Sequence, residues 1–405
     1  MLKRYFLNNK KRNFSTASIW IKGGSDMDST GKKGINKILC SLLTRGCEGF
    51  NNFTLSEYIE SYGAELNQEI FEDGISISIK SLNEHFSKLF PLLDLIINKP
   101  ILSETEFKKV KKSSIDHIKK DKENPFNICF EKWRKIVYSN HPYAFNTIGN
   151  ANDVSKITYE DVLLEFKNFK NREKYLISNN PEINGENFGT LEKKILKEKS
   201  DPLNHNLNTT NRFDYINNDS NQTIIMMGDQ TCSRRSSEYF PLKVLESYLS
   251  YGMSAALFKL FREKHGITYD LGVYYPIRSG NAPFLIYLSV SNEQALFAFE
   301  LLSTLWKNLL FNPLTDAEIF LAKEKLKGSF LLGNQSLDEI LQRKIQLVSY
   351  GISPISENDL NSKIEEISSL DILKLTNKYF SKPFLSISGN KNICLEISNR
   401  WKKNF

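Results

Sequence analysis

Two segments far apart in the sequence carry the same pattern, and this repeat restricts the folds that the chain can adopt. Apolar helices are expected at 86–97 and 295–310, because apolar residues recur there with helical spacing. Each is followed by an Asn, a Pro and then a Lys-rich stretch, at 98–107 in the first case and 311–319 in the second. The same order of elements in both places favours an internal duplication.

Both Lys-rich stretches begin with the same start signal. Ser103 precedes Glu106 by three positions, and Thr315 precedes Glu318 by three positions. This is the spacing of a capping box, in which the hydroxyl accepts from a backbone amide and the carboxylate accepts from the amide of the capping residue. We therefore expect Ser103 and Thr315 at equivalent helix N-termini of two related domains.

A polar stretch rich in Asn separates the two halves. The 405 residues are enough for two domains, each with a core of its own. Residues 186–222 show no periodicity, which is typical of a linker. The sequence predicts an N-terminal domain over 1–185 and a C-terminal domain over 223–405.

The N-terminal half predicts an α+β domain. Short apolar strands are expected at 17–22, 64–70 and 75–79, and a helix at 33–45. Thr54 and Glu57 have the spacing of a third capping box, so a further helix is expected to begin there. The last strand alternates Ile with polar residues, as a half-buried strand does, and Asp73-Gly74 before it is a hairpin signal. Hairpins mixed with helices indicate an antiparallel sheet backed by helices.

Composition excludes several classes of protein. The net charge of +7 includes a Lys-rich helix face but no basic patch interleaved with aromatic residues, so nucleic-acid binding is not expected. The most apolar stretch, 89–97, contains Pro91 and Asp94 and is too short to span a bilayer. Five scattered cysteines and the absence of an apolar run after the basic N-terminus favour a soluble, cytoplasmic protein.

Four motifs in the same order resemble those of the insulinase/pitrilysin family of metallopeptidases, the M16 or inverzincin group. They lie at 23–26 (GGSD), 63–67 (GAELN), 141–149 (HPY followed by Gly) and 252–269 (GMSAALF through REKHGITY). The resemblance implies two homologous α+β domains, each with about six antiparallel strands and helices on one face. It also implies that two such chains, or one chain of double length, enclose a peptide chamber.

The family's zinc motif is degenerate in this chain. The resemblance places H-x-x-E-H on the helix over 33–45, where two His bind zinc and the Glu activates a water. Lys37 and Ser41 stand at the His positions, and Cys40 stands at the Glu position. The position of the third ligand is His117, which we expect to face solvent. We therefore expect no metal or other cofactor in this chain.

Cys40 invites a second interpretation, as a nucleophile. A nucleophilic thiol needs a base within hydrogen-bond reach, and no motif links Cys40 to His85 or His117. A small Cys among leucines on a helix is more often part of a core.

The second half retains residues to which the family assigns a role. The resemblance implies that Arg262 and Tyr269 donate to the substrate carbonyl and its developing oxyanion, facing the zinc site of the other domain. Asn67 falls on the strand to which active members add the substrate as a further strand. The family's N-A-x-T reads Asn-Gln-Glu-Ile here, so an ordinary edge strand is the competing interpretation.

These observations favour a non-catalytic subunit of a heterodimeric zinc metalloendopeptidase, active in proteolysis only with a zinc-bearing M16 homologue as partner. Its substrates would be peptides, and neither nucleic acid nor a membrane is an expected partner. Two alternatives remain: a structural homologue kept for assembly, and a homodimeric peptide-binding protein without a catalytic role.

Overall fold

The computed structural model describes residues 2–7, 13–187, 211–218, 220–268, 270–332, 336–352 and 357–405. The chain forms two compact units, and each is assembled from three separate segments. The first unit contains residues 1–120, 145–200 and 333–355. The second contains residues 121–144, 201–332 and 356–405.

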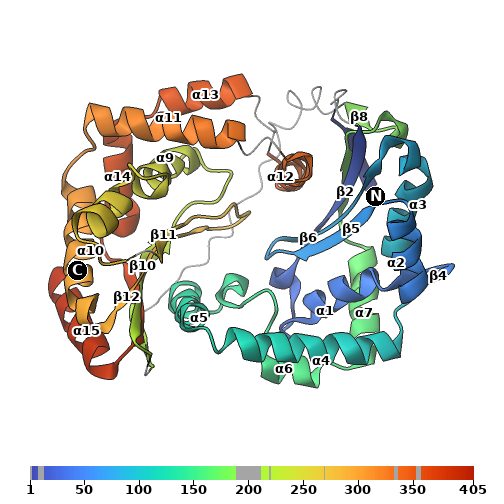
Figure 1. Ribbon diagram of the computed structural model, residues 1–405, viewed down its shortest axis with the longest axis horizontal. Helices are drawn as coiled ribbons and strands as arrows, with labels where there is room; N and C mark the ends of the chain where they lie inside the picture. Colours follow the sequence, from blue (N-terminus) through green and yellow to red (C-terminus); the bar gives the residue numbers. More distant parts are fainter. Residues whose placement is uncertain are drawn as a thin grey trace. The chain divides into compact units, whose positions relative to one another are not determined.

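The first unit is built on a six-stranded sheet (Figure 1). Its order is β5 (Glu65–Ile70), β6 (Gly74–Leu82), β2 (Phe14–Lys22), β7 (Lys174–Ser178), β1 (Leu2–Phe6) and β8 (Glu186–Asn187). The first four strands pair antiparallel, as expected, and β1 pairs parallel with both β7 and β8. A small separate pair is formed by β3 (Gly46–Cys47) and β4 (Phe50–Asn51).

Alternate residues of the central strands build the main core of this unit. Ile19 pairs with Ile77 and Ile21 with Ile75, and all four side chains are buried in one cluster. The cluster is closed by α1 (Ile35–Leu43), α2 (Asn52–Ser61), α3 (Asn83–Asn98), α4 (Glu104–Asp121), α6 (Ala151–Lys156) and α7 (Tyr159–Lys170). The predicted alternation along β6 is therefore confirmed.

The other face of this sheet is covered as well. Trp20 and Tyr175 pack with Leu341 and Ile345 of α12 (Leu337–Ser349) in a second buried cluster. Ser76, on the polar side of β6, is buried too. The strand is therefore more than half-buried, because a helix from a distant part of the sequence lies on this face.

The second unit repeats the first. Its five-stranded sheet has the order β11 (Asp270–Tyr274), β12 (Pro283–Ser291), β10 (Gln222–Gln230), β13 (Phe384–Gly389) and β9 (Phe213–Asn217). The last strand again joins in parallel. Its helices include α9 (Tyr239–Ser250), α10 (Ala295–Phe311), α11 (Asp316–Leu332), α13 (Glu357–Glu365), α14 (Ser369–Phe380) and α15 (Lys391–Asn404).

The correspondence extends to the repeated segments. Ser103 immediately precedes α4 and Thr315 immediately precedes α11. Each of these helices follows the helix that comes after the strand pair at one edge of its sheet, β5–β6 or β11–β12. Strands β5, β6, β2, β7 and β1 occupy the places that β11, β12, β10, β13 and β9 occupy in the second sheet. The expected α+β class and two related domains are confirmed.

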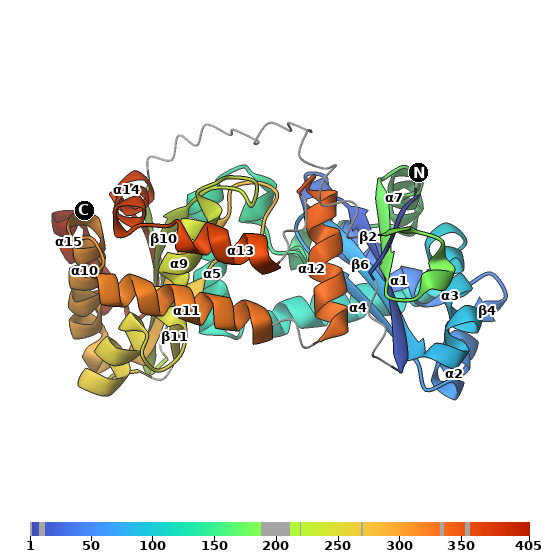
Figure 2. The same cartoon turned by 90° about the horizontal axis from the view of Figure 1, so that it is seen from above.

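One helix from each half of the sequence packs on the sheet of the other half (Figure 2). Helix α5 (Pro125–Tyr138) lies on β9, β10 and β13, where Cys129 Sγ is 3.5 Å from Ser386 Oγ. Helix α12 lies on β2 and β7. The compact units therefore depart from the expected boundaries at 185 and 223, because local sequence patterns do not show which sheet a helix covers.

The expected linker is described only at its ends. Residues 188–210 lie outside the described residues. Residues 213–217 form strand β9 rather than a linker, and β10 begins at Gln222. Within the described ranges, no helix combines the length and apolar character that a membrane span requires.

Candidate functional site

Helix α1 carries the positions to which the resemblance assigns the zinc motif, and a buried carboxylate fixes where this helix begins. Gly34 precedes it with a φ of 102°, a conformation that favours glycine. Asp28 Oδ2 accepts from the Gly34 amide at 2.6 Å, and its Oδ1 accepts from the Asn36 amide at 3.1 Å and from Asn36 Nδ2 at 2.8 Å. Asp28 thus satisfies amide groups that the first helical turn leaves unpaired.

The three side chains at the motif positions do not fit a zinc ion. Cys40 is fully buried, and burial raises the pKa of its thiol to about 12, although nearby Lys37 opposes the shift. A zinc ligand must be the thiolate, which this environment disfavours. Lys37 and Ser41 are half-buried and offer an ammonium group and a hydroxyl. A cation repels the metal, and a hydroxyl is not among the usual zinc ligands.

The wider surroundings of α1 supply no replacement ligand set. His117 is exposed on α4, as expected. Across the described part of the chain, no three His, Cys, Asp or Glu side chains lie together in a way that could hold a metal ion. The buried thiol also makes Cys40 a core residue of the first unit rather than an accessible nucleophile.

Asp26 and Arg172 form a charged network beside α1 that the sequence did not predict. The carboxyl of Asp26 accepts from the Gly24 amide at 2.8 Å, and burial followed by repulsion from Asp73 raises its pKa to about 7. Arg172 donates to Asn36 Oδ1 and to Gly23 O, both at 2.9 Å. These bonds tie the start of α1 to the turn after β2. The motif at 23–26 marks this turn, but its partner Arg172 lies too far along the sequence to be found by spacing.

Asn67 lies on β5, the edge strand of the described first sheet, and its side chain is exposed. A groove of about 530 Å³ runs beside this strand. It is lined by residues of β5 such as Asn67 and Gln68, and by Leu55 and Ile59 of α2. The exposed edge has the geometry that strand addition by a peptide requires.

Arg262 lies on an unusual helix of the second unit. Residues Phe258–Lys264 form a π-helix, a rare conformation that occurs often at functional sites. The guanidinium group is exposed, and its central carbon lies 4.9 Å from the centre of the Phe258 ring. The helix ends before Gly266, where φ is +62°, and the edge strand β11 follows at Asp270. Tyr269 lies outside the described residues.

Comparison with known families places both halves of the chain in one group. Residues 4–151 match the family described as insulinase, peptidase family M16, and residues 182–326 match the family described as the peptidase M16 inactive domain. Together the two matches cover most of the chain.

Similar proteins occur in several bacteria. A protein named as a zinc protease from Rickettsia felis is 23% identical over 370 residues, which cover 89% of this chain and 88% of that protein. Another so named, from Bacillus subtilis, is 22% identical over 412 residues, which cover 96% and 99%.

Solved structures share the fold. A peptidase M16 inactive domain from Pseudomonas fluorescens superposes with a TM-score of 0.80 at 20% identity, covering 96% of this chain and 95% of the other. A protease from Helicobacter pylori superposes with a TM-score of 0.82 at 17% identity, covering 95% and 96%.

Proposed function

The chain belongs to the M16 (insulinase) family of peptidases, and from that premise we propose that it is the non-catalytic subunit of a heterodimeric zinc metalloendopeptidase. A partner of the same family would carry the zinc and the general base. This chain would complete the peptide chamber and supply donors to the partner's active site.

One observation carries the proposal. The M16 fold is retained over nearly the whole chain, while Lys37, Cys40 and Ser41 occupy the positions of the metal ligands and the base on α1. A chain of this kind cannot activate a water through a metal of its own. Its value to a peptidase would therefore lie in the groups that it presents to another chain.

Arg262 and Tyr269 are the groups that we assign to this role. The exposed guanidinium of Arg262 and the phenol of Tyr269 would donate to the oxyanion that forms when water attacks the peptide carbonyl. Fixed donors of this kind stabilise charge that develops only in the transition state. The π-helix before the β11 edge supports the assignment, because it gives Arg262 a backbone position that an ordinary helix would not.

The test is peptide turnover by the pair reconstituted with the zinc-bearing partner. Loss of one oxyanion donor typically lowers kcat by about 10²–10³. We expect Arg262→Ala and Tyr269→Phe each to approach that loss while assembly and the partner's zinc content stay unchanged. Arg262→Lys should rescue only partly, because an ammonium group lacks the planar fork of guanidinium. Glu263→Ala changes an exposed neighbour on the same helix and should leave kcat unchanged.

A wild-type kcat in the Arg262→Ala, Tyr269→Phe double variant would refute the donor role and leave the chain as a structural subunit. The two losses should be less than additive if both groups serve one oxyanion.

The groove along β5 favours a second candidate, a peptide-binding protein without a catalytic role. In that case extended peptides would bind the isolated chain through β5, and Asn67 would contact them. Titration of the isolated chain with fluorescent peptides distinguishes the two candidates. The second candidate is supported if the isolated chain binds peptides tightly and the complex purified from cells contains no zinc-bearing partner.

A further inference from the structure

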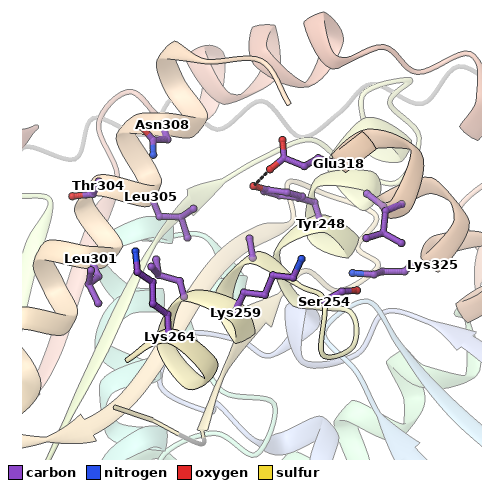
Figure 3. Close-up of a pocket in the computed structure, with 14 residues that line it drawn as sticks. Tyr248, Ser254, Lys259, Lys264, Leu301, Thr304, Leu305, Asn308, Glu318 and Lys325 are labelled. Atoms are coloured by element: carbon purple, nitrogen blue, oxygen red, sulfur yellow. Dashed lines mark hydrogen bonds between the residues drawn. The ribbon is translucent and has the colours of Figure 1, made fainter. Parts of the chain in front are cut away.

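The second unit contains a groove of about 510 Å³ that lies among four of its helices (Figure 3). Its walls come from α9, from the π-helix over 258–264, from α10 and from α11. The volume is within the range of about 300–1,000 Å³ that small-molecule sites occupy. Arg262 is not among the described residues that line it, so the groove is distinct from the position of that guanidinium group.

Three ammonium groups line this groove, from Lys259, Lys264 and Lys325. Among the described residues, none of the three forms a hydrogen bond or an ion pair. In Figure 3 the side chains of Lys259 and Lys325 extend toward each other. Burial and then the like charge of Lys259 lower the pKa of Lys325. The groove therefore gathers three ammonium groups, none of which is hydrogen-bonded or ion-paired to a carboxylate of the described chain.

The acidic residue in the wall has other partners. Glu318 Oε2 accepts from the Thr315 amide at 2.9 Å and from Thr315 Oγ1 at 2.8 Å, while Oε1 accepts from the Tyr248 hydroxyl at 3.1 Å. The carboxylate thus serves the start of α11, and it attracts Lys259 only through space. With three ammonium groups and one carboxylate, the site is suited to an anion.

The rest of the wall is apolar. Leu301 and Leu305 of α10, Leu260 of the π-helix and Leu321 of α11 line the groove. Leu321 is 40% exposed, so this apolar surface is open to a ligand. A bare inorganic anion would leave these leucines in water, and a neutral apolar molecule would leave the lysines uncompensated.

We propose that this groove binds a small amphipathic carboxylate, with its head group between Lys259 and Lys325 and its apolar body against the leucines of α10. The ammonium group of lysine is a compact point charge with freely turning donors, which suits a head group shared by two residues. Apolar contact with the leucines adds affinity in proportion to the area that it removes from water.

The test is calorimetric titration of the full chain with decanoate. We expect one site, with binding that weakens as salt is added because exposed charges are screened. Decanol lacks the charged head and inorganic phosphate lacks the apolar body, so each should bind at least about tenfold more weakly than decanoate. Decyl phosphate is a further arm: weaker binding than that of decanoate supports a carboxylate head, and tighter binding overturns it.

The variant Lys259→Met, Lys325→Met keeps the apolar stems and removes both charges. It should bind decanoate at least about tenfold more weakly, for the same reason. Lys403→Met, an exposed position on α15, is the matched control and should bind as the wild type does. The proposal is overturned if the double variant keeps the wild-type affinity, or if decanol binds as tightly as decanoate.

Discussion

At the scale of single residues, Asp26 links the region of α1 to pH. Its carboxyl has a pKa of about 7 in the folded chain, against 3.8 for an ordinary aspartate, chiefly because it is buried. Between these two values the unfolded chain has lost a proton that the folded chain keeps. Stability is therefore lost as the pH rises through this window, and the loss is complete above about pH 7.

Asp26→Asn should remove this loss, because the amide oxygen can still accept from Gly24 and carries no charge. We expect the variant to be more stable than the wild type by roughly 2–4 kcal/mol at pH 8, and nearly equal to it at pH 4. Urea unfolding at both pH values measures the difference. Asp116→Asn, at an exposed position on α4, is the control and should show no such dependence. Equal stability of Asp26→Asn and the wild type at pH 8 would contradict the argument.

At the scale of elements, the structure confirms one of the three predicted capping boxes in full and a second in part, and it contradicts the third. Thr315 and Glu318 form the complete box, with amide-to-side-chain distances of 3.3 and 2.9 Å. Ser103 Oγ accepts from the amide of Glu106, but the Glu106 carboxylate pairs with Arg45 and Lys109 instead of returning to Ser103. Two cationic donors outcompete one backbone amide, because charge-assisted bonds are stronger.

The third box was wrong. The pair Thr54 and Glu57 is not at a helix start, because Asn51 caps α2 and accepts from the amides of Phe53 and Thr54. We expect Thr315→Ala to lower the free energy of unfolding by about 1 kcal/mol, as removal of a cap usually does, and Thr54→Ala to have a much smaller effect. Urea denaturation of both variants makes the comparison. Equal losses would show that the bonds of Thr315 add nothing beyond those of an ordinary helical threonine.

Helix α12 stabilises the first sheet, because its apolar side chains are buried against that sheet. Leu341 is fully buried against Trp20 and Tyr175, so Leu341→Ala should cost about 2–5 kcal/mol. The loss should appear as faster amide hydrogen exchange in β2 and β7 and not in β12. Glu339→Ala, exposed on the same helix, is the control. Faster exchange confined to β12 would contradict this, because it would show that α12 stabilises the second sheet instead of the first.

At the scale of the whole molecule, the side chains on α1 predict how the purified chain behaves with metal. We expect extensively dialysed protein to hold no stoichiometric zinc and to cleave no peptide, because Lys37, Cys40 and Ser41 do not form a ligand set. Metal analysis by mass spectrometry is the measurement. One tightly bound zinc per chain, lost in His117→Ala, would show that an unrecognised site exists.

Local patterns in the sequence determined a large part of this fold. The alternation along β6 and the repeated helix pair each depend on a few adjacent positions, so they could be recognised without coordinates. The duplication predicts that the two sheets share one strand order, but not which order that is. Arg262 lies on a π-helix, which no local sequence pattern indicates.

Contacts between distant positions were decided only by the tertiary structure. Helices α5 and α12 each pack on the sheet formed by the other half of the sequence. The ion pair of Glu106 with Arg45, the burial of Asp26 and the proximity of Lys259 to Lys325 likewise depend on residues that lie far apart in the sequence or on different elements. Periodicity shows that a helix has an apolar face, but not which surface that face covers. Burial, pKa and the partner of a charged group depend on that surface, so they emerge only when the chain is folded.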